Sequence, residues 1–205
     1  MTLPVRFTGD LAELPTHAFG NRSLTWWGII GFFMIEGTGF ALAIGAYFFI
    51  MGGEQSWPPA PFSPPNAVAG TIFTILLLLS EIPNTLAKRA AERMDLKALQ
   101  KYLLIVCAMC VLMLVPRALE FNSLNVSWDD NAYGSIVWTL LFLHVTHYLT
   151  DFADTAVLTA LLFTNHSAEP RRFVDASENA MYWRFVWLCW LPIYLLIYWL
   201  PRWVS

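Results

Sequence analysis

Apolar residues fill this chain in five long segments that are separated by shorter polar stretches. A hydrocarbon core of about 30 Å requires roughly 20 mostly apolar residues in helical conformation. The segments that reach this length are about 26–51, 68–87, 99–119, 133–163 and 181–202. The pattern predicts an all-α, polytopic membrane protein with five transmembrane helices. We expect a tail over residues 1–25 and a five-helix transmembrane domain over residues 26–202.

Prolines and charged residues predict the connections between these segments. Pro83 is expected to kink or end the second helix, because proline lacks an N–H and clashes with the preceding turn. The charged stretch 87–101 is rich in helix formers and should continue as helix at the membrane surface. Residues 52–66, GGEQSWPPAPFSPPN, should form an ordered extramembrane loop with extended segments.

The basic residues lie unevenly on the two sides of the predicted bundle. Of the 12 Lys and Arg residues, all except Arg117 and Arg202 fall on the side of the N-terminus. Cytoplasmic loops carry the excess of basic residues in membrane proteins. This distribution predicts a cytoplasmic N-terminus and an external C-terminus, in the inner (plasma) membrane of a bacterium.

Composition supports the membrane assignment and argues against nucleic-acid binding and a cysteine-based metal or redox site. Hydrophobic residues make up 57% of the chain and charged residues 13%, whereas a soluble domain is about one quarter charged. No basic patch with interleaved aromatic residues indicates nucleic-acid binding. The polar N-terminus lacks the apolar region of a signal peptide and is expected to be retained. Cys107 and Cys110 lie within an apolar run, which favours helix packing over a metal or redox site.

The fourth segment carries a polar stripe within LLFLHVTHYLTDFADTAVLTALLF, residues 140–163. His144, His147, Asp151 and Asp154 fall within an arc of about 80° on a helix. Ionisable groups in hydrocarbon are costly and normally face a protein interior or a water-filled path. We expect the stripe to face the other helices.

Two further carboxylates are predicted at membrane depth, and the chemistry of the set stays open. Glu36 lies about ten residues into the first helix, and Glu81 about six residues from the end of the second. A polar seam between helices, a proton or ion path, and a site for iron, manganese or zinc all fit these residue types. The seam is favoured, and the E-x-x-H signature of carboxylate-bridged metal pairs is absent from the sequence. The metal or ion candidates are Glu81, His147, Asp151 and Asp154.

Arg117 and Glu120 lie near the outer end of the third segment at a spacing of i, i+3. Residues at this spacing are neighbours on a helix surface. We expect them to form an ion pair at the membrane interface.

Five motifs follow one another along the chain: FFMIEG with Glu36 followed by A-Y-F at 46–48, W-P-P at 57–59, R-A-L-E-F at 117–121, H-x-x-H at 144–147, and Y-W-R-F-V at 182–186 followed by Y-W at 198–199. With these motifs the chain resembles the cytochrome c oxidase subunit III family of haem–copper oxidases. The family often shows Q-x-x-E-Tyr at the third motif and Y-W-H-F-V-D at the last. Each motif is weak alone, but five in order over residues 26–202 are specific.

The chain also departs from the family pattern. It lacks the first two helices of the family, whose V-shaped cleft with the other five holds lipid. Arg117, Arg184 and Trp187 replace the family's Gln, His and Asp, and Asp151 stands where Gly is usual. Together with the additional carboxylates on the second and fourth segments, these departures indicate a short, divergent, five-helix relative.

The resemblance implies a non-catalytic membrane subunit of a respiratory haem–copper oxidase that supports assembly, stability, lipid binding and proton uptake. Its partners would be the catalytic subunit, other oxidase subunits and phospholipid, and haem and copper would belong to those partners. Glu36, His144, His147 and Glu120 would be family-type polar or proton-related positions. The residues agree, because no set of intramembrane histidines on several helices could ligate haems and copper.

Two alternatives remain open at this point. The chain could be the accessory subunit of a nitric oxide reductase or a quinol oxidase, because the partner defines the reaction. It could also be a divergent membrane protein that binds a metal or ions through the stripe from His144 to Asp154.

Overall fold

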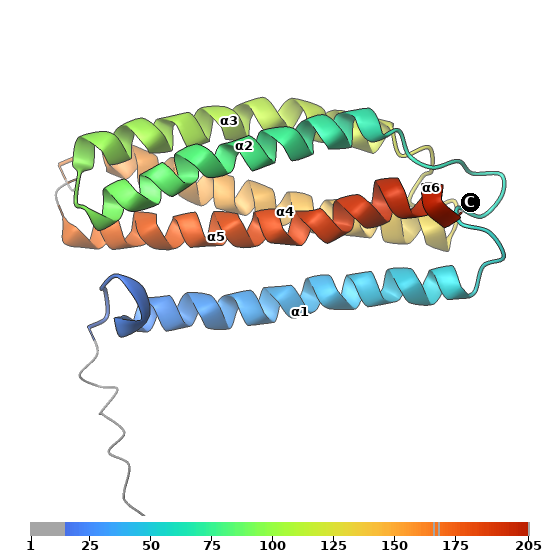
Figure 1. Cartoon of the computed structure of the whole chain (residues 1–205), viewed down its shortest axis with the longest axis horizontal. Helices are drawn as coiled ribbons and strands as arrows, with labels where there is room; N and C mark the ends of the chain where they lie inside the picture. The colour runs from blue at the N-terminus through green and yellow to red at the C-terminus, as the bar shows by residue number, and fades with distance from the viewer. Residues whose placement is uncertain (1–14, 166, 168, 205) are drawn as a thin grey trace, which may run out of the picture.

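The computed structural model describes residues 15–165, 167 and 169–204, so most of the predicted N-terminal tail lies outside the described residues. Five long helices account for most of the described part of the chain (Figure 1). They are α1 Leu24–Gly52, α2 Ala67–Glu92, α3 Leu96–Asn122, α4 Ala132–Leu161 and α5 Pro170–Tyr194. A π-helical turn, Leu195–Trp199, joins α5 to the short α6, Leu200–Val204, and a 3-10 turn, Gly20–Arg22, precedes α1. The predicted all-α architecture is confirmed.

Four of the helical segments are long and apolar enough to cross a membrane: α1, α2, α3 and the continuous segment Pro170–Val204. Within the described residues α4 is the exception, although it is 30 residues long. Its mean hydropathy is lowered by the histidines and aspartates of the stripe. The chain is therefore a multi-pass membrane protein whose fourth helix carries the histidines and aspartates of the stripe.

Two helices extend beyond the predicted segments. The helix that contains Pro83, which was predicted to kink or end there, does not end there but continues to Glu92, with Pro83 buried between helices. Proline removes one backbone hydrogen bond, and packing of α2 against α3 and α5 maintains the helix around the gap. The last helix begins at Pro170 rather than near residue 181, since its first three turns are polar yet pack against the bundle. Proline is well suited to this first helical position.

Side-chain caps fix where three of the helices begin. Asn66, Asp95 and Asn131 precede α2, α3 and α4, and each accepts a hydrogen bond from a backbone N–H of the first turn. Such caps satisfy donors that have no partner within the helix. The stretch 87–101, predicted to continue as helix, is helical except for a short break at Arg93–Asp95, where α2 has ended and α3 begins.

Helices α2 to α5 form a bundle, and α1 runs along one side of it (Figure 1). The core contains large aromatic side chains, among them Phe73, Trp183 and Trp190. Helix α1 packs mainly against α4 and α5 and buries only Phe40 and Tyr47 among its own residues. It is therefore the least enclosed of the five long helices.

The loop after α1 attaches this helix to the rest of the protein. Trp57 is 3% exposed and lies between the rings of Tyr47 and Tyr133. Its indole N–H donates to the Tyr47 hydroxyl at 2.7 Å, and that hydroxyl donates to the backbone oxygen of Leu196 at 2.6 Å. The predicted ordered loop therefore closes one end of the interface between α1 and α5. At the other end, α1 and the α4–α5 pair line a cleft.

Candidate functional site

His144, the first residue of the stripe, lies inside the bundle between α3, α4 and α5. Its Nε2 is 3.1 Å from the backbone oxygen of Val186, and its Nδ1 is 3.2 Å from Nη2 of Arg117. A carbonyl only accepts and a guanidinium only donates. The ring is therefore the neutral tautomer with its proton on Nε2, which fixes its orientation.

Arg117 and Glu120 form the predicted ion pair, with Nη1 and Oε2 2.5 Å apart. The two side chains are only 3% and 0% exposed, so the pair lies inside the bundle rather than on its surface. The guanidinium carbon lies 3.5 Å from the ring centroid of Phe73 and 4.1 Å from that of Trp190. Tyr198 donates to the second carboxylate oxygen at 2.9 Å. Aromatic faces, a counter-charge and hydrogen bonds together permit a guanidinium in the interior.

Glu36 of α1 and His147 of α4 meet at the interface of these helices. His147 Nε2 is 2.7 Å from Glu36 Oε2, and Nδ1 is 2.7 Å from the backbone oxygen of Leu143. Since Nδ1 must donate to that carbonyl, one further proton is shared between Nε2 and the carboxylate. Phe40 covers the imidazole with its ring centroid 4.8 Å away. The structure thus joins two of the predicted family-type positions into a proton-holding pair.

Asp151 and Asp154 share a partner that the sequence did not reveal. Asn179 of α5 donates from Nδ2 to Asp151 Oδ1 at 3.1 Å and to Asp154 Oδ2 at 3.5 Å. Its own oxygen accepts from Thr155 at 3.0 Å. Asn179 lies in the polar stretch that precedes the predicted last segment, so the prediction placed it in a connection between two membrane-spanning segments. Only the extension of α5 to Pro170 brings it opposite the stripe.

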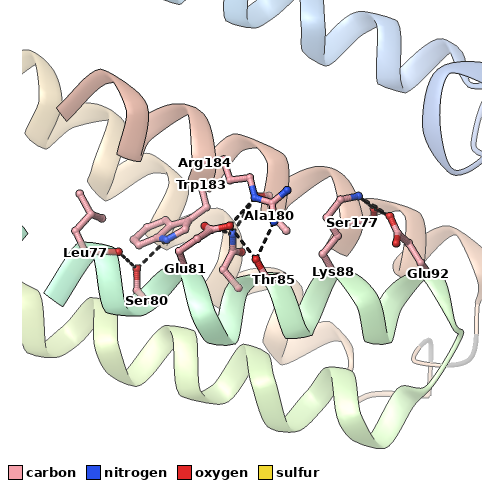
Figure 2. A network of polar contacts seen from close by, with 11 residues as sticks. Leu77, Ser80, Glu81, Thr85, Lys88, Glu92, Ser177, Ala180, Trp183 and Arg184 are labelled. Atoms are coloured by element: carbon pink, nitrogen blue, oxygen red, sulfur yellow. Dashed lines mark hydrogen bonds and ion pairs between the residues drawn. The ribbon is translucent and has the colours of Figure 1, made fainter. Parts of the chain in front are cut away.

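Glu81 lies apart from the stripe, on the seam between α2 and α5 shown in Figure 2. Its Oε1 accepts from Nε of Arg184 at 2.5 Å and from Thr85 at 3.0 Å. Its Oε2 accepts from Asn84 at 2.9 Å, and Asn84 also donates to the backbone oxygen of Ala180 at 3.1 Å. Glu81 therefore completes an interhelical network and does not approach the other three metal or ion candidates.

The same seam carries three further hydrogen bonds, two between α2 and α5 and one within α2 (Figure 2). Trp183 donates from its indole to Ser80 at 2.9 Å. Lys88 donates to Glu92 at 2.5 Å and to Ser177 at 2.9 Å. Interhelical hydrogen bonds of this kind hold membrane helices in register.

The cleft between α1, α4 and α5 has a volume of about 790 Å³ and gathers most of the stripe. His147, Asp151 and Asp154 line it, whereas His144 faces the bundle interior. In the described part of the chain no group of three or more His, Cys, Asp or Glu side chains is placed to hold a metal ion. The arrangement offers imidazole and carboxyl groups, which can bind and release protons, along one wall of the cleft.

Comparisons with known proteins extend along nearly the whole chain. The family model described as cytochrome c oxidase subunit III matches residues 16–203. A cytochrome c oxidase subunit 3 of Synechocystis sp. is 25% identical over 183 residues, which cover 87% of this chain and 77% of the relative. A probable cytochrome c oxidase subunit 3 of Mycobacterium tuberculosis is 26% identical over 208 residues, covering 97% and 98% of the two chains. The mycobacterial relative, which this chain matches over nearly its whole length, thus has the same subunit name as the family model.

Proposed function

The chain belongs to the cytochrome c oxidase subunit III family, and from this premise we propose that it is the non-catalytic membrane subunit of a respiratory haem–copper oxidase. The observation that carries the proposal is the family match over residues 16–203, which spans all five long helices. Haem and copper belong to the partner subunits, so the reaction with oxygen takes place outside this chain.

The names of the relatives favour the oxidase over the alternatives. The relatives from Synechocystis sp. and Mycobacterium tuberculosis are named as cytochrome c oxidase subunits, which supports oxygen rather than nitric oxide as the substrate of the complex. The contacts of the stripe also support an accessory role. His147 is paired with Glu36, and both aspartates are bonded to Asn179, as expected for a seam that holds helices together.

The proposed role has a structural part and a protonic part. The bundle supports assembly and stability of the catalytic subunit, binds phospholipid, and has no nucleic-acid partner. The Glu36–His147 pair, which shares a proton in a 2.7 Å hydrogen bond, supports proton uptake by the complex. The supporting observation is that this pair lines a cleft together with the carboxylates of α4 and α5.

The proposed location is the inner membrane of a bacterium, with the N-terminus in the cytoplasm and the C-terminus outside. Ten of the 12 basic residues lie on the N-terminal side of the membrane domain, which supports this orientation. The loop between α4 and α5 and the cleft beside it then face the cytoplasm.

Affinity purification of the tagged chain in mild detergent tests the proposal. We expect a haem-bearing catalytic subunit at a fixed ratio to this chain, measured by mass spectrometry and the visible spectrum of one eluate. The eluate should consume oxygen and not reduce nitric oxide. A haem-free eluate with stoichiometric iron, manganese or zinc would instead assign the function to the stripe.

A further inference from the structure

One ion pair of this chain lies on the surface of the bundle, on the seam between α2 and α5 (Figure 2). Nε of Arg184 donates to Oε1 of Glu81 at 2.5 Å, and the two side chains are 40% and 26% exposed. Neither residue lines the cleft beside α1. In contrast to the enclosed pair of Arg117 and Glu120, this pair is covered by the chain on one side only.

The two residues of the pair lie at the depth of the hydrocarbon core, which is about 30 Å thick. With a rise of about 1.5 Å per residue, Glu81 lies about 21 Å along α2 from Ala67. Arg184 lies roughly 22 Å from Trp199, an exposed tryptophan at the same end of the bundle. Ionisable side chains at such depth face protein or a water-filled cavity rather than acyl chains. The exposed side of the pair therefore requires a cover that lipid does not supply.

The hydrogen bonds of the pair define what such a cover must offer. Nε of Arg184 donates to Glu81 and Nη2 donates to Thr85 at 2.8 Å. Nη1, which carries two N–H groups, makes no hydrogen bond to the described residues. Both oxygens of Glu81 already accept hydrogen bonds, and its charge cancels that of the guanidinium. A further carboxylate would leave an unbalanced charge in the bilayer, so the position beside Nη1 fits an uncharged acceptor oxygen.

The surface beside the pair is apolar on both helices. Leu78 and Ile82 of α2 are exposed within one turn of the carboxylate. Leu188 and Leu195 of α5 are exposed at i+4 and i+11 from the guanidinium, which keeps them on one side of the helix. An aliphatic surface with a single polar position is complementary to another transmembrane helix. We call this surface the docking face, and it consists of Leu78, Glu81, Ile82, Arg184, Leu188 and Leu195.

We propose that the docking face binds a transmembrane helix of another subunit of the oxidase complex, and that an uncharged side-chain oxygen of that helix accepts from Nη1 of Arg184. The acceptor belongs to a serine, threonine, asparagine or glutamine of the partner. This inference rests on the proposed function for the existence of the complex. A wholly apolar helix leaves the N–H groups of Nη1 unmet, and an acidic helix adds an unbalanced charge. The ion pair therefore selects the sequence of its partner.

Photo-cross-linking in the intact complex tests the proposal. The photoreactive residue p-benzoyl-phenylalanine replaces Leu188 in the tagged full chain, membranes are irradiated, and the complex is purified in mild detergent. Mass spectrometry then identifies the attached peptide. We expect one transmembrane segment of another subunit, with serine, threonine, asparagine or glutamine within one turn of the attachment point. The adduct should fall at least tenfold when Glu81→Leu and Arg184→Met remove both charges together. The control Lys88→Gln removes a cation of the same seam about 32 Å along α2, beyond the hydrocarbon core, and should keep the adduct.

The other outcomes separate this inference from the proposed function. Adducts with lipid alone, with a second copy of this chain or with an extramembrane peptide overturn the docking face, and so does an equal yield in the variant without the two charges. In each of these cases a haem-bearing eluate that consumes oxygen keeps the accessory role. A haem-free eluate refutes the proposed function, and the subunit partner falls with it. Arg184→Lys keeps the charge beside Glu81 without the second terminal nitrogen, so it should also lose the adduct and decides the test where the double variant does not fold.

Discussion

Replacing Glu120 by glutamine removes the charge that compensates Arg117 inside the bundle. Breaking a buried ion pair by removal of one partner costs about 3–5 kcal/mol, because the other charge remains in the interior. The rings of Phe73 and Trp190, 3.5 and 4.1 Å from the guanidinium carbon, retain part of the compensation. We therefore expect the lower end of this range, about 3 kcal/mol, for Glu120→Gln.

A double-mutant cycle separates the charge from the hydrogen bonds. Arg117→Met alone leaves the carboxylate of Glu120 with Tyr198 as its hydrogen-bond partner and should also cost about 3 kcal/mol. The double variant, with no charge left to bury, should lie near the wild type or above it in stability. If only hydrogen bonds mattered, each single variant would lose about 0.6 kcal/mol, the average for membrane helices.

Reversible unfolding of the purified full chain in mixed micelles measures these differences. A loss of about 3 kcal/mol corresponds to roughly 6–12 °C in Tm for a chain of this size. Single variants within 1 kcal/mol of the wild type would refute the argument. So would a double variant that loses as much as the sum of the two single changes.

Further expected outcomes concern three other contacts. Glu36→Gln removes the carboxylate that shares a proton with His147 of α4. Oxygen turnover by the complex should fall, or its inactivation accelerate, most at alkaline pH. Identical pH profiles of turnover and inactivation for the variant and the wild type would count against the protonic role. Gly70→Ala places a Cβ 2.5 Å from the Tyr198 ring and should destabilise the chain by about 1–3 kcal/mol, whereas Gly39→Ala, with open space around it, should be neutral or mildly stabilising in the same unfolding assay. Tyr47→Phe loses the bonds to the loop and to the backbone after α5, and should cost about 1–2 kcal/mol there; an unchanged midpoint would show that these bonds do not hold α1.

The helices could be predicted from sequence because length and apolarity alone decide which segments fit a bilayer. The observed bounds of α1 to α4 lie within a few residues of the predicted ones, apart from the end of α2. The helix does not end at Pro83, because packing on two sides outweighs the local effect of proline, and sequence periodicity does not report that packing.

The partners of the stripe could not be predicted, since a stripe on one helix does not say which helix it faces. The pairing of Glu36 with His147 depends on α1 lying against α4 rather than α2. Asn179 was missed because its polar surroundings resemble a loop. The burial of Arg117 was missed because a charge near a helix end is usually exposed, and the aromatic rings that accept it come from α2 and α5.

The one-sided attachment of α1 has a consequence for biosynthesis. Glu36 and His147 are 111 residues apart, so the first helix enters the bilayer long before its partner is translated. At about 5–20 residues per second the delay is roughly 6–22 s. During this interval a carboxyl group lies in lipid or in the insertion machinery without its imidazole. Helices α4 and α5, which are synthesised last, are thus the ones against which α1 packs. The first helix to be synthesised is therefore the last to reach its final position.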